Sequence, residues 1–511
     1  MERIDSWSRK KYLVLTPPSE EDNCPYQERI LRELEPEFGK IHTELCVLRQ
    51  LSAVCEQADW KITAVLSWDG KRWCLAGIEA GDTSRRNYGI CADLGSTTIA
   101  VQILDMDTGE VLAEESGFNP QTAFGEDILT RIFCCKENAE KLEEIRQKTV
   151  EGFLGLFSRI EEKTGISPER DCTNLVISGN TTMIHFLYGL DPFPVFASPY
   201  AVRTLAPEIY PGRELGFPIR GYVYSYPARA NYLGGDIISG MIATGIPFRE
   251  ELSVFLDIGT NGELVIGNKD FLISGAGAAG PALEGGVVKY GMRAEEGAAD
   301  RVKIENGEVK LHVLGGGEAR GFCGSGIVDL LAQLFLAGWI NMQGKLQPEA
   351  SPLIREREGE LCVVCGENLF FYQSDIDEFL KTKAAANTMV EYLMACIGLQ
   401  MDEIERFYVS GAFGTHISRS SGITIGLYPD LPEERLILPG NTSLAGAGKM
   451  LLNRAYAKKT EEILDKMEYV QFGAVEDFLQ IMVAAAAFPH TDYRRYPSVM
   501  EELARRGRPL E

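Results

Sequence analysis

Residues Cys91 to Asp105 read CADLGSTTIAVQILD, and this stretch decides the fold. An apolar run ends near Asp93, the chain passes through a Gly-Ser-Thr-Thr turn, and a second apolar run follows. This is the pattern of a strand, a tight hairpin and a strand. Gly95 can adopt backbone angles that other residues resist, so successive amide N–H groups can point into one concavity. Such a turn suits phosphate oxygens, Asp93 could hold hydrated Mg2+ beside them, and hydroxyl groups follow at Ser96, Thr97 and Thr98.

The same pattern occurs again in Ser253 to Ile266, SVFLDIGTNGELVI. A single Asp-X-Gly-Ser hairpin would mean little, because many antiparallel sheets use one only to turn the chain. The second copy has its own apolar strand, an aspartate at Asp257, a Gly259-Thr260 turn and an outgoing strand. Both copies then continue through another turn into a third short strand. An internal repeat of this kind predicts two related lobes that face each other across a cleft.

Two further motifs complete a set of four. Phe407 to Gly414, FYVSGAFG, fits an adenosine-binding loop, and Leu175 to Asn180, LVISGN, fits a connecting strand that feeds a helix. In this order the motifs resemble those of the actin, sugar kinase and Hsp70-like ATPase superfamily. The resemblance implies an α/β (α+β) fold of two RNase H-like lobes with ATP and Mg2+ between them.

Whole segments resemble one family more closely, the RACo-like reductive activators of corrinoid proteins. The similarity extends from about Lys11 to Gly448, and it is carried by ADWKITAVL, NPQTAFGEDILTRI, VISGNTTMIHFLYGLDP, FLDIGTNGELVIG, GAGAAGPALEGGVVKYGMRA and CGSGIVDLLA. The resemblance implies an ATPase that enables reduction of a Co(II) corrinoid protein to Co(I) for methyl transfer. It also implies a corrinoid protein as partner, and related activators suggest a homodimer.

The resemblance further implies which residues contact the phosphates and the metal. Asp93 is expected to bind Mg2+ through water. The phosphate contacts are expected from both turns: Gly95, Ser96, Thr97 and Thr98 in the first, and Gly259, Thr260, Asn261 and Gly262 in the second. The nucleoside is expected at two glycine-rich segments, one at a helix start and one after a strand: Gly324, Ser325 and Gly326, and Gly411, Ala412, Phe413 and Gly414.

ATP hydrolysis needs in-line placement of water and charge stabilisation more than a covalent nucleophile. Asp257 or Glu263 is therefore the candidate for orienting the attacking water. Asp236, which follows Leu233-Gly234-Gly235 at a predicted helix start, is an alternative, although it could be only a favourable charge at that N-terminus. Arg131 is expected at the edge of the cleft, and His185 is expected to be a packed histidine rather than a ligand.

The cysteines depart from the family pattern. The activators carry an N-terminal plant-type [2Fe–2S] domain, which needs a C-x4-C-x2-C kind of spacing. The twelve cysteines of this sequence show no such spacing, and Cys362 and Cys365 form a CxxC pair that is expected to be structural. The sequence therefore predicts no Fe–S cluster in this chain. A separate ferredoxin-like protein is the expected electron donor, and two alternatives stay open: the chain acts only as the ATP-driven conformational subunit, or it is a truncated form. The scattered cysteines also fit a reducing, cytoplasmic compartment.

Composition excludes several classes of protein. The 511 residues include 51 basic and 74 acidic side chains, a formal net charge of -23, which disfavours nucleic-acid binding. An apolar content of 45% supplies ample core. The opening MERIDSWSRKKY lacks an apolar signal segment, and no apolar run approaches the ~18 residues that span a bilayer, so neither secretion nor membrane insertion is expected.

The predicted domains are a small mixed N-terminal linker domain at 1–85, a first ATPase lobe at 86–248, a second lobe with closing helices at 249–490, and a C-terminal tail at 491–511. The N-terminal domain should contain a hairpin through Asp69-Gly70. Ser374 with Asp377 predicts the start of a long helix, and 441–452 predicts a closing helix.

Two other functions remain open from the sequence. The first is a small-molecule kinase, in which Asp257 would serve as the base. The second is a nucleotide-dependent conformational switch with little turnover.

Overall fold

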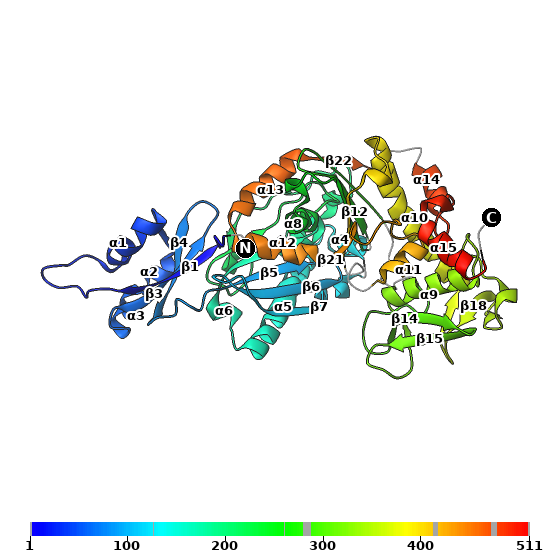
Figure 1. Cartoon of the computed structure of the whole chain (residues 1–511). Coiled ribbons are helices and arrows are strands. Elements are labelled where there is room, and N and C mark those ends of the chain that lie inside the picture. The colour runs from blue at the N-terminus through cyan, green and yellow to red at the C-terminus, as the bar shows by residue number, and fades with distance from the viewer. Residues whose placement is uncertain are drawn as a thin grey trace. The chain divides into compact units, whose positions relative to one another are not determined.

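The computed structural model describes residues 3–125, 127–259, 261–278, 288–411, 417–471 and 478–508. The chain forms two compact units of mixed helices and strands (Figure 1). Unit 1 consists of Met1–Gly245 and Thr442–Lys466, and unit 2 consists of Ile246–Asn441 and Met467–Glu511. The second unit therefore interrupts the first in sequence. None of the helices within the described ranges is both long and apolar enough to cross a membrane.

Unit 1 is built on a six-stranded sheet of order β7-β6-β5-β8-β10-β9. The first three strands form an antiparallel meander, whereas β8 and β10 run parallel to β5. The strand bounds are Tyr88–Leu94 (β5), Thr98–Asp105 (β6), Val111–Phe118 (β7), Cys172–Gly179 (β8), Tyr210–Pro211 (β9) and Tyr222–Ser225 (β10).

Unit 2 repeats this arrangement in the order β21-β20-β11-β12-β13-β22. Here β11, β12 and β13 form the antiparallel meander, and β20 and β21 continue parallel to β11. The bounds are Ser253–Ile258 (β11), Asn261–Gly267 (β12), Leu272–Ala278 (β13), Arg406–Ser410 (β20), Leu436–Gly440 (β21) and Met467–Gln471 (β22). The predicted internal repeat is confirmed over five strands of each sheet. Unit 2 adds the edge strand β22, parallel to β13, whereas unit 1 adds β9 at the opposite edge, antiparallel to β10.

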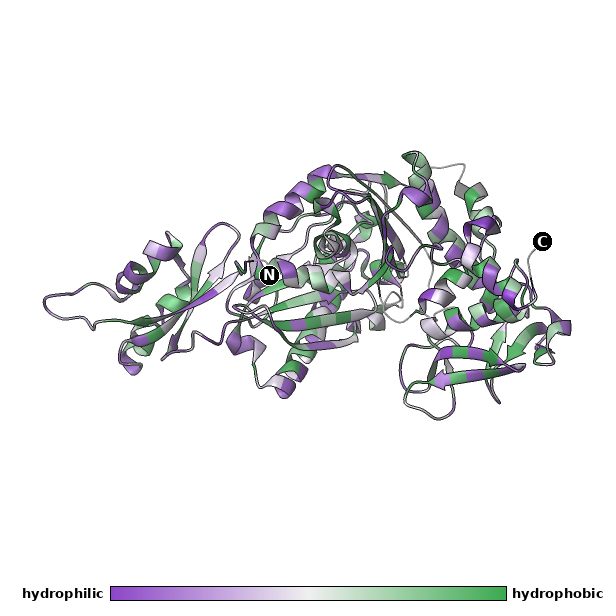
Figure 2. Cartoon of the chain, in the orientation of Figure 1, coloured by the Kyte–Doolittle hydropathy of each residue, from purple (hydrophilic) through white to green (hydrophobic). Residues whose placement is uncertain are grey.

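Helices cover the sheet of unit 1. They are α4 (Ile128–Cys135), α5 (Ala139–Thr164), α6 (Pro168–Asp171), α7 (Thr181–Tyr188), α8 (Gly235–Thr244), α12 (Thr442–Leu452) and α13 (Ala455–Lys466). The apolar face of α5 packs on the sheet through Ile145, Phe153, Phe157 and Ile160. By contrast α13 is largely hydrophilic and buries few residues (Figure 2).

A separate core forms in the N-terminal part of unit 1, around a four-stranded sheet of order β1-β3-β4-β2. Its elements are β1 (Ser8–Val14), α1 (Tyr26–Phe38), β2 (His42–Thr43), α2 (Leu45–Leu48), α3 (Leu51–Gln57), β3 (Lys61–Trp68) and β4 (Trp73–Ala80). The predicted hairpin is present, because β3 and β4 pair antiparallel on either side of Asp69-Gly70.

Among its described residues, unit 2 adds further helices and two small sheets. The helices are α9 (Gly324–Ala337), α10 (Gln373–Cys396), α11 (Arg419–Thr424), α14 (Phe478–Ala485) and α15 (Pro497–Arg505). The small sheets contain β14 (Ala298–Glu305), β15 (Glu308–Val313) and β16 (Gly321–Phe322), and β17 (Ile354–Arg357), β18 (Glu360–Val364) and β19 (Phe370–Tyr372).

Three details differ from the sequence expectations. Residues 442–466, expected with the second lobe, belong to unit 1. The segment expected as a tail contains α15, whose Val499 and Leu503 join the core of unit 2. Helix α10 begins at Gln373, and it is Asp375 that accepts a hydrogen bond from the Tyr372 N–H. Asp377 instead accepts a hydrogen bond from Lys345 Nζ, so the expected pairing of Asp377 with Ser374 at the helix start was wrong.

Candidate functional site

Asp93 lies near the end of β5, beside the end of the parallel strand β8. Its register partner on β8 is Ser178. The hydroxyl of Ser443, near the start of α12, donates to Asp93 Oδ1 at 2.7 Å, and Ser443 Oγ lies 2.9 Å from Ser178 Oγ. Asp93 is only partly buried. A carboxylate is therefore fixed at the edge of the sheet with one oxygen already oriented by the protein.

The turn after β5 is fixed by hydrogen bonds to its carbonyl groups. The carbonyl oxygen of Gly95 accepts from Asn119 Nδ2 at 2.8 Å, and that of Thr97 accepts from the Asn119 N–H at 2.8 Å. Between them, the Ser96 carbonyl accepts from Arg131 Nη1 at 2.6 Å. Three consecutive carbonyls are thus bonded to one segment that includes the 3-10 helix Pro120–Phe124 and α4. This bonding fixes the orientation of the turn's peptide groups.

Arg131 is completely buried, and Nε also donates to the Gly125 carbonyl at 2.8 Å. Burial lowers the pKa of the guanidinium to about 10. The sequence placed Arg131 at a cleft edge, whereas the structure makes it an internal brace of the turn. Neither Asn119 nor Ser443 was among the predicted site residues.

The turn leaves no room for a side chain at its first residue. A Cβ on Gly95 would lie 2.7 Å from the Thr98 carbonyl oxygen, and a Cβ on Gly234 would lie 2.4 Å from Asn180 Cα. Gly234 directly precedes α8, and Asn180 caps α7 by accepting from the Met183 N–H at 3.0 Å. The starts of both helices and the β5 turn therefore belong to one face of unit 1.

Asp236 is in the first turn of α8, and its Oδ1 accepts from the Ile237 N–H at 3.0 Å. It is partly buried. This placement is consistent with both meanings given to it from the sequence, a water-orienting carboxylate and a charge at the helix N-terminus.

The second copy of the motif brings Asp257 and Glu263 together. They are direct partners across the antiparallel pair β11–β12, so their side chains project from the same face of the sheet. The Gly259 N–H donates to the Asn261 carbonyl at 2.8 Å, which closes the turn ahead of Gly262.

Gly411 approaches the same carboxylate from β20. Its φ is +96°, and a Cβ there would lie 2.7 Å from Asp257 Oδ1. Ser410 is the parallel partner of Asp257, as Ser178 is of Asp93, so the repeat extends to the neighbouring strand. The predicted positions Thr260, Ala412, Phe413 and Gly414 lie outside the described residues.

Gly324, Ser325 and Gly326 form the first turn of α9. A Cβ on Gly326 would lie 2.0 Å from the Ala299 carbonyl oxygen on β14, so this glycine lets the helix pack against the strand. Ser325 Oγ contacts Cys323 Sγ at 3.3 Å. Gly324, Ser325 and Gly326, the three predicted nucleoside contacts on α9, are buried.

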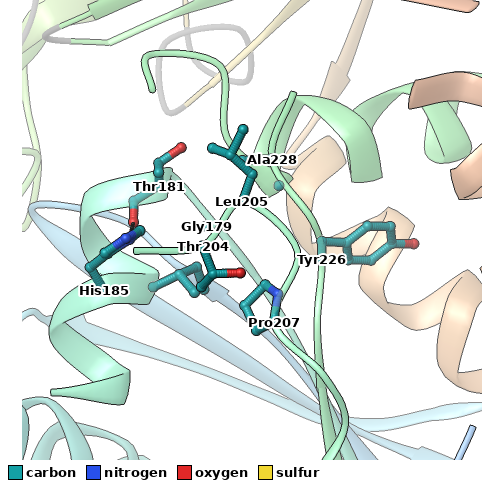
Figure 3. Close-up of a pocket in the computed structure, with 10 residues that line it drawn as sticks. Gly179, Thr181, His185, Thr204, Leu205, Pro207, Tyr226 and Ala228 are labelled. Atoms are coloured by element: carbon teal, nitrogen blue, oxygen red, sulfur yellow. Dashed lines mark hydrogen bonds between the residues drawn. The ribbon is translucent and has the colours of Figure 1, made fainter. Parts of the chain in front are cut away.

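His185 lines a small cavity of unit 1 with Thr181, Leu205, Pro207 and Tyr226 (Figure 3). Its Nδ1 contacts the Thr181 carbonyl at 2.7 Å, and burial lowers the pKa of the imidazole. With an exposed fraction of 1%, His185 is a packed histidine.

These residues fit a magnesium nucleotide. A partly exposed carboxylate, a glycine turn with hydroxyl groups and two helix N-termini are the groups that hold hydrated Mg2+ and phosphate oxygens. Within the described ranges, no group of three or more His, Cys, Asp or Glu side chains forms a direct metal site. Asp93 could hold Mg2+ through water without such a group.

Two sheets that share a five-stranded arrangement, each with an aspartate at the end of its first strand and a glycine turn after it, define the actin-like ATPase fold. The chain matches three consecutive family regions: the RACo linker region over residues 3–85, the RACo middle region over residues 88–248, and the C-terminal domain of RACo, the ASKHA domain, over residues 251–500. The protein belongs to the RACo family.

Individual relatives agree with this membership. A corrinoid activation enzyme, RamQ, of Eubacterium limosum is 30% identical over 454 residues, which are 85% of this chain and 75% of that enzyme. A Co(II) methylated amine-specific corrinoid protein reductase of Methanosarcina barkeri is 24% identical, covering 74% of this chain and 73% of the reductase. A solved reductive activator for corrinoid, iron-sulfur protein superposes with a TM-score of 0.88 at 34% identity, covering 98% of this chain and 81% of that one.

Proposed function

We propose that the protein is an ATP-dependent reductive activator of a corrinoid protein. It returns an inactive Co(II) corrinoid to Co(I), the state that accepts a methyl group, and it couples ATP hydrolysis to a conformational change that permits this reduction. The cobalt gains one electron, while ATP and water give ADP and phosphate.

One observation carries the proposal: the solved reductive activator covers 98% of this chain at 34% identity. Both curated relatives are also named for activating or reducing corrinoid proteins. Carboxylates and glycine turns of the kind found after β5 and β11 are groups that ATP hydrolysis uses.

We assign the following roles to the chain's own residues. Asp93 holds Mg2+ through water, and Ser443 keeps that carboxylate oriented. Bound Mg2+ would neutralise phosphate charge. Phosphate oxygens contact the turn at Gly95, Ser96, Thr97 and Thr98, which Asn119 and Arg131 brace, and the second turn at Gly259, Thr260, Asn261 and Gly262.

Asp257 or Glu263 orients the attacking water, with Asp236 as the alternative. A carboxylate in this role accepts a hydrogen bond from the water and directs its lone pair in line with the leaving group. Gly324, Ser325 and Gly326, with Gly411, Ala412, Phe413 and Gly414, hold the nucleoside.

We propose that the electron comes from a separate ferredoxin-like protein. We further propose a homodimer in the cytoplasm, where thiols stay reduced; all twelve cysteines are free.

The test measures ATP hydrolysis by the purified chain, alone and with a Co(II) corrinoid protein, while Co(I) absorbance is recorded with an external reductant. Stimulated hydrolysis together with Co(I) formation supports the proposal, and Asp93→Ala should abolish both. Hydrolysis that depends on a small phosphate acceptor would indicate a kinase instead. Tight binding with negligible turnover would indicate a nucleotide switch.

Asp257→Asn and Glu263→Gln separate the candidate catalytic groups. The variant that loses turnover and keeps nucleotide affinity identifies the residue that orients water. If both retain turnover, Asp236→Asn is the next variant.

A further inference from the structure

Three buried serine hydroxyls form a chain that ends on Asp93. Ser239 Oγ on α8 lies 2.6 Å from Ser178 Oγ on β8, which lies 2.9 Å from Ser443 Oγ on α12. Ser443 Oγ in turn lies 2.7 Å from Asp93 Oδ1. A fourth contact, of 2.9 Å, joins Ser239 Oγ to the Asp236 carbonyl at the start of α8.

The number of hydrogens limits how many of these contacts are hydrogen bonds. Each hydroxyl carries one hydrogen, so the three serines can donate only three of the four possible bonds. The bond to the carboxylate is charge-assisted and the strongest of them, so Ser443 donates to Asp93.

Ser239 Oγ donates to the Asp236 carbonyl at 2.9 Å, so the Ser178 hydrogen is the one left for the contacts of Ser178 with Ser239 and Ser443. The bond from Ser443 to Asp93 is the one whose direction the carboxylate charge fixes. The position of Ser443, and with it the start of α12, therefore depends on the charge that surrounds Asp93.

The other end of α12 is held by the N-terminal residues. Its last carbonyls, which have no partner within the helix, accept from residues of the chain start: Met450 O from Trp7 Nε1 at 2.7 Å, Leu451 O from the Trp7 N–H at 3.2 Å, and Leu452 O from the Asp5 N–H at 3.1 Å. Trp7 is 1% exposed.

Arg454 strengthens this attachment. It pairs with Asp5 at 2.8 Å, and its guanidinium carbon lies 4.5 Å from the ring centroid of Trp68 and 4.6 Å from that of Trp73. These two tryptophans belong to β3 and β4, the central strands of the N-terminal sheet.

Helix α12 is also closely packed along its length. A Cβ on Gly446 would lie 2.0 Å from the Ser239 carbonyl oxygen, and the Tyr226 hydroxyl donates to the Gly446 carbonyl at 2.9 Å. Figure 1 shows the helix beside α8 and β5. An 11-residue helix of about 16 Å with such neighbours moves as one body.

We propose that Ser443 is a positioning residue for Asp93 and that α12 transmits the metal and nucleotide state at Asp93 to the N-terminal domain, the region that matches the RACo linker. The inference rests on the proposed function, because it assumes that Asp93 holds Mg2+ beside a nucleotide. When Mg2+ draws the carboxylate, the Ser443 bond moves with it, and the Trp7 attachment moves at the far end.

The test uses the full chain labelled with 5-fluorotryptophan, whose fluorine signals report each tryptophan separately. Mg2+ is titrated at a saturating concentration of a nonhydrolysable ATP analogue. In the wild type, the signals of Trp7, Trp68 and Trp73 should shift with Mg2+, whereas that of Trp60, away from α12, should shift less.

Ser443→Ala removes one hydroxyl at nearly constant volume. We expect the half-saturating Mg2+ concentration to rise about tenfold, as for loss of one hydrogen bond to a charged group. The Trp7 shift at saturation should fall to less than half. Ser158→Ala on α5, whose hydroxyl donates only to the Leu154 carbonyl, is the matched control and should behave as wild type.

Arg454→Met tests the other end. It should change the half-saturating Mg2+ concentration less than Ser443→Ala does, and it should reduce the shifts of Trp68 and Trp73. A wild type whose Trp7 signal ignores Mg2+ while the nucleotide binds, or a Ser443→Ala variant identical to wild type, overturns the inference and leaves the proposed function intact. Failure of the wild type to bind the analogue overturns both.

Discussion

Replacement of Arg131 by methionine tests whether this side chain orients the turn after β5, which we propose to contact phosphate. The bonds from Arg131 to the Ser96 and Gly125 carbonyls, at 2.6 and 2.8 Å, come from a charged donor and contribute roughly 1.5–3 kcal/mol each. Against them stands the burial of the cation, which lowers its pKa from 12.5 to about 10 and so costs about 3 kcal/mol. Subtracting the burial cost from the two bonds leaves about 0–3 kcal/mol, so the global free energy of unfolding should fall by about 3 kcal/mol or less.

The burial cost of the cation offsets part of its effect on stability, but nothing offsets its effect on the orientation of the turn. Without the guanidinium, the Ser96–Thr97 peptide group can rotate, and the Thr97 N–H then loses the orientation that we expect toward a phosphate oxygen. Loss of one oriented contact to a charged group should weaken binding of a magnesium nucleotide by about 10- to 100-fold. Arg131→Lys keeps the charge but cannot donate along both directions of the planar guanidinium, so it should fall between.

The assay is calorimetric titration with Mg2+ and a nonhydrolysable ATP analogue, beside thermal unfolding of the same samples. Lys148→Met, which removes an exposed cation paired with Glu151 on α5, is the control and should bind as wild type. Wild-type affinity in a folded Arg131→Met protein would refute the reasoning. So would a large loss of stability with no separate effect on binding.

Three further predictions concern stability and binding. Gly446→Ala should destabilise unit 1 by several kcal/mol in thermal unfolding, because its Cβ would lie 2.0 Å from the Ser239 carbonyl oxygen. Gly155→Ala, which has open space around it, should be neutral or stabilising by ~0.5–1 kcal/mol, and equal effects of the two variants would contradict the close packing of α12. Asn119→Ala should weaken the same nucleotide about tenfold by calorimetry, because it frees the Gly95 carbonyl; unchanged affinity would exclude its role. Burial lowers the pKa of Lys383 to about 7, below the ~10.4 of an unfolded lysine, so the unfolded chain binds more protons between these pH values and the stability of unit 2 should rise with pH from about 7 to about 10. Urea unfolding followed at the fluorine signal of Trp339 should show this slope in the wild type and lose it in Lys383→Met. A slope that persists in the variant would assign the effect to another group.

Local sequence patterns predicted the strands and turns that the two sheets have in common. Apolar runs that end in Asp93 and Asp257 and continue through glycine turns produced the expected strands, because alternation and turn chemistry act over a few residues. The pairing of Asp257 with Glu263 follows from the same local register.

The groups that hold the site in place could not be predicted in this way. Asn119 and Arg131 reach the turn through the fold of the segment that follows β7, and an arginine on an amphipathic helix reads as exposed in the sequence. Ser443 lies 350 residues from Asp93, and nothing local marks a serine after a strand as its partner. Tertiary packing alone brings these residues together.

The interrupted sequence of unit 1 has a consequence for synthesis. Strand β5 leaves the ribosome early, yet the helix that carries Ser443 follows 350 residues later. At ~5–20 residues per second, this interval lasts roughly 20–70 s. During that time the sheet face that α12 will cover, including Cys91 and Leu104, has no helix over it. A nascent chain of this protein therefore needs protection by a chaperone, or rapid folding of the intervening unit, before Ser443 can reach Asp93.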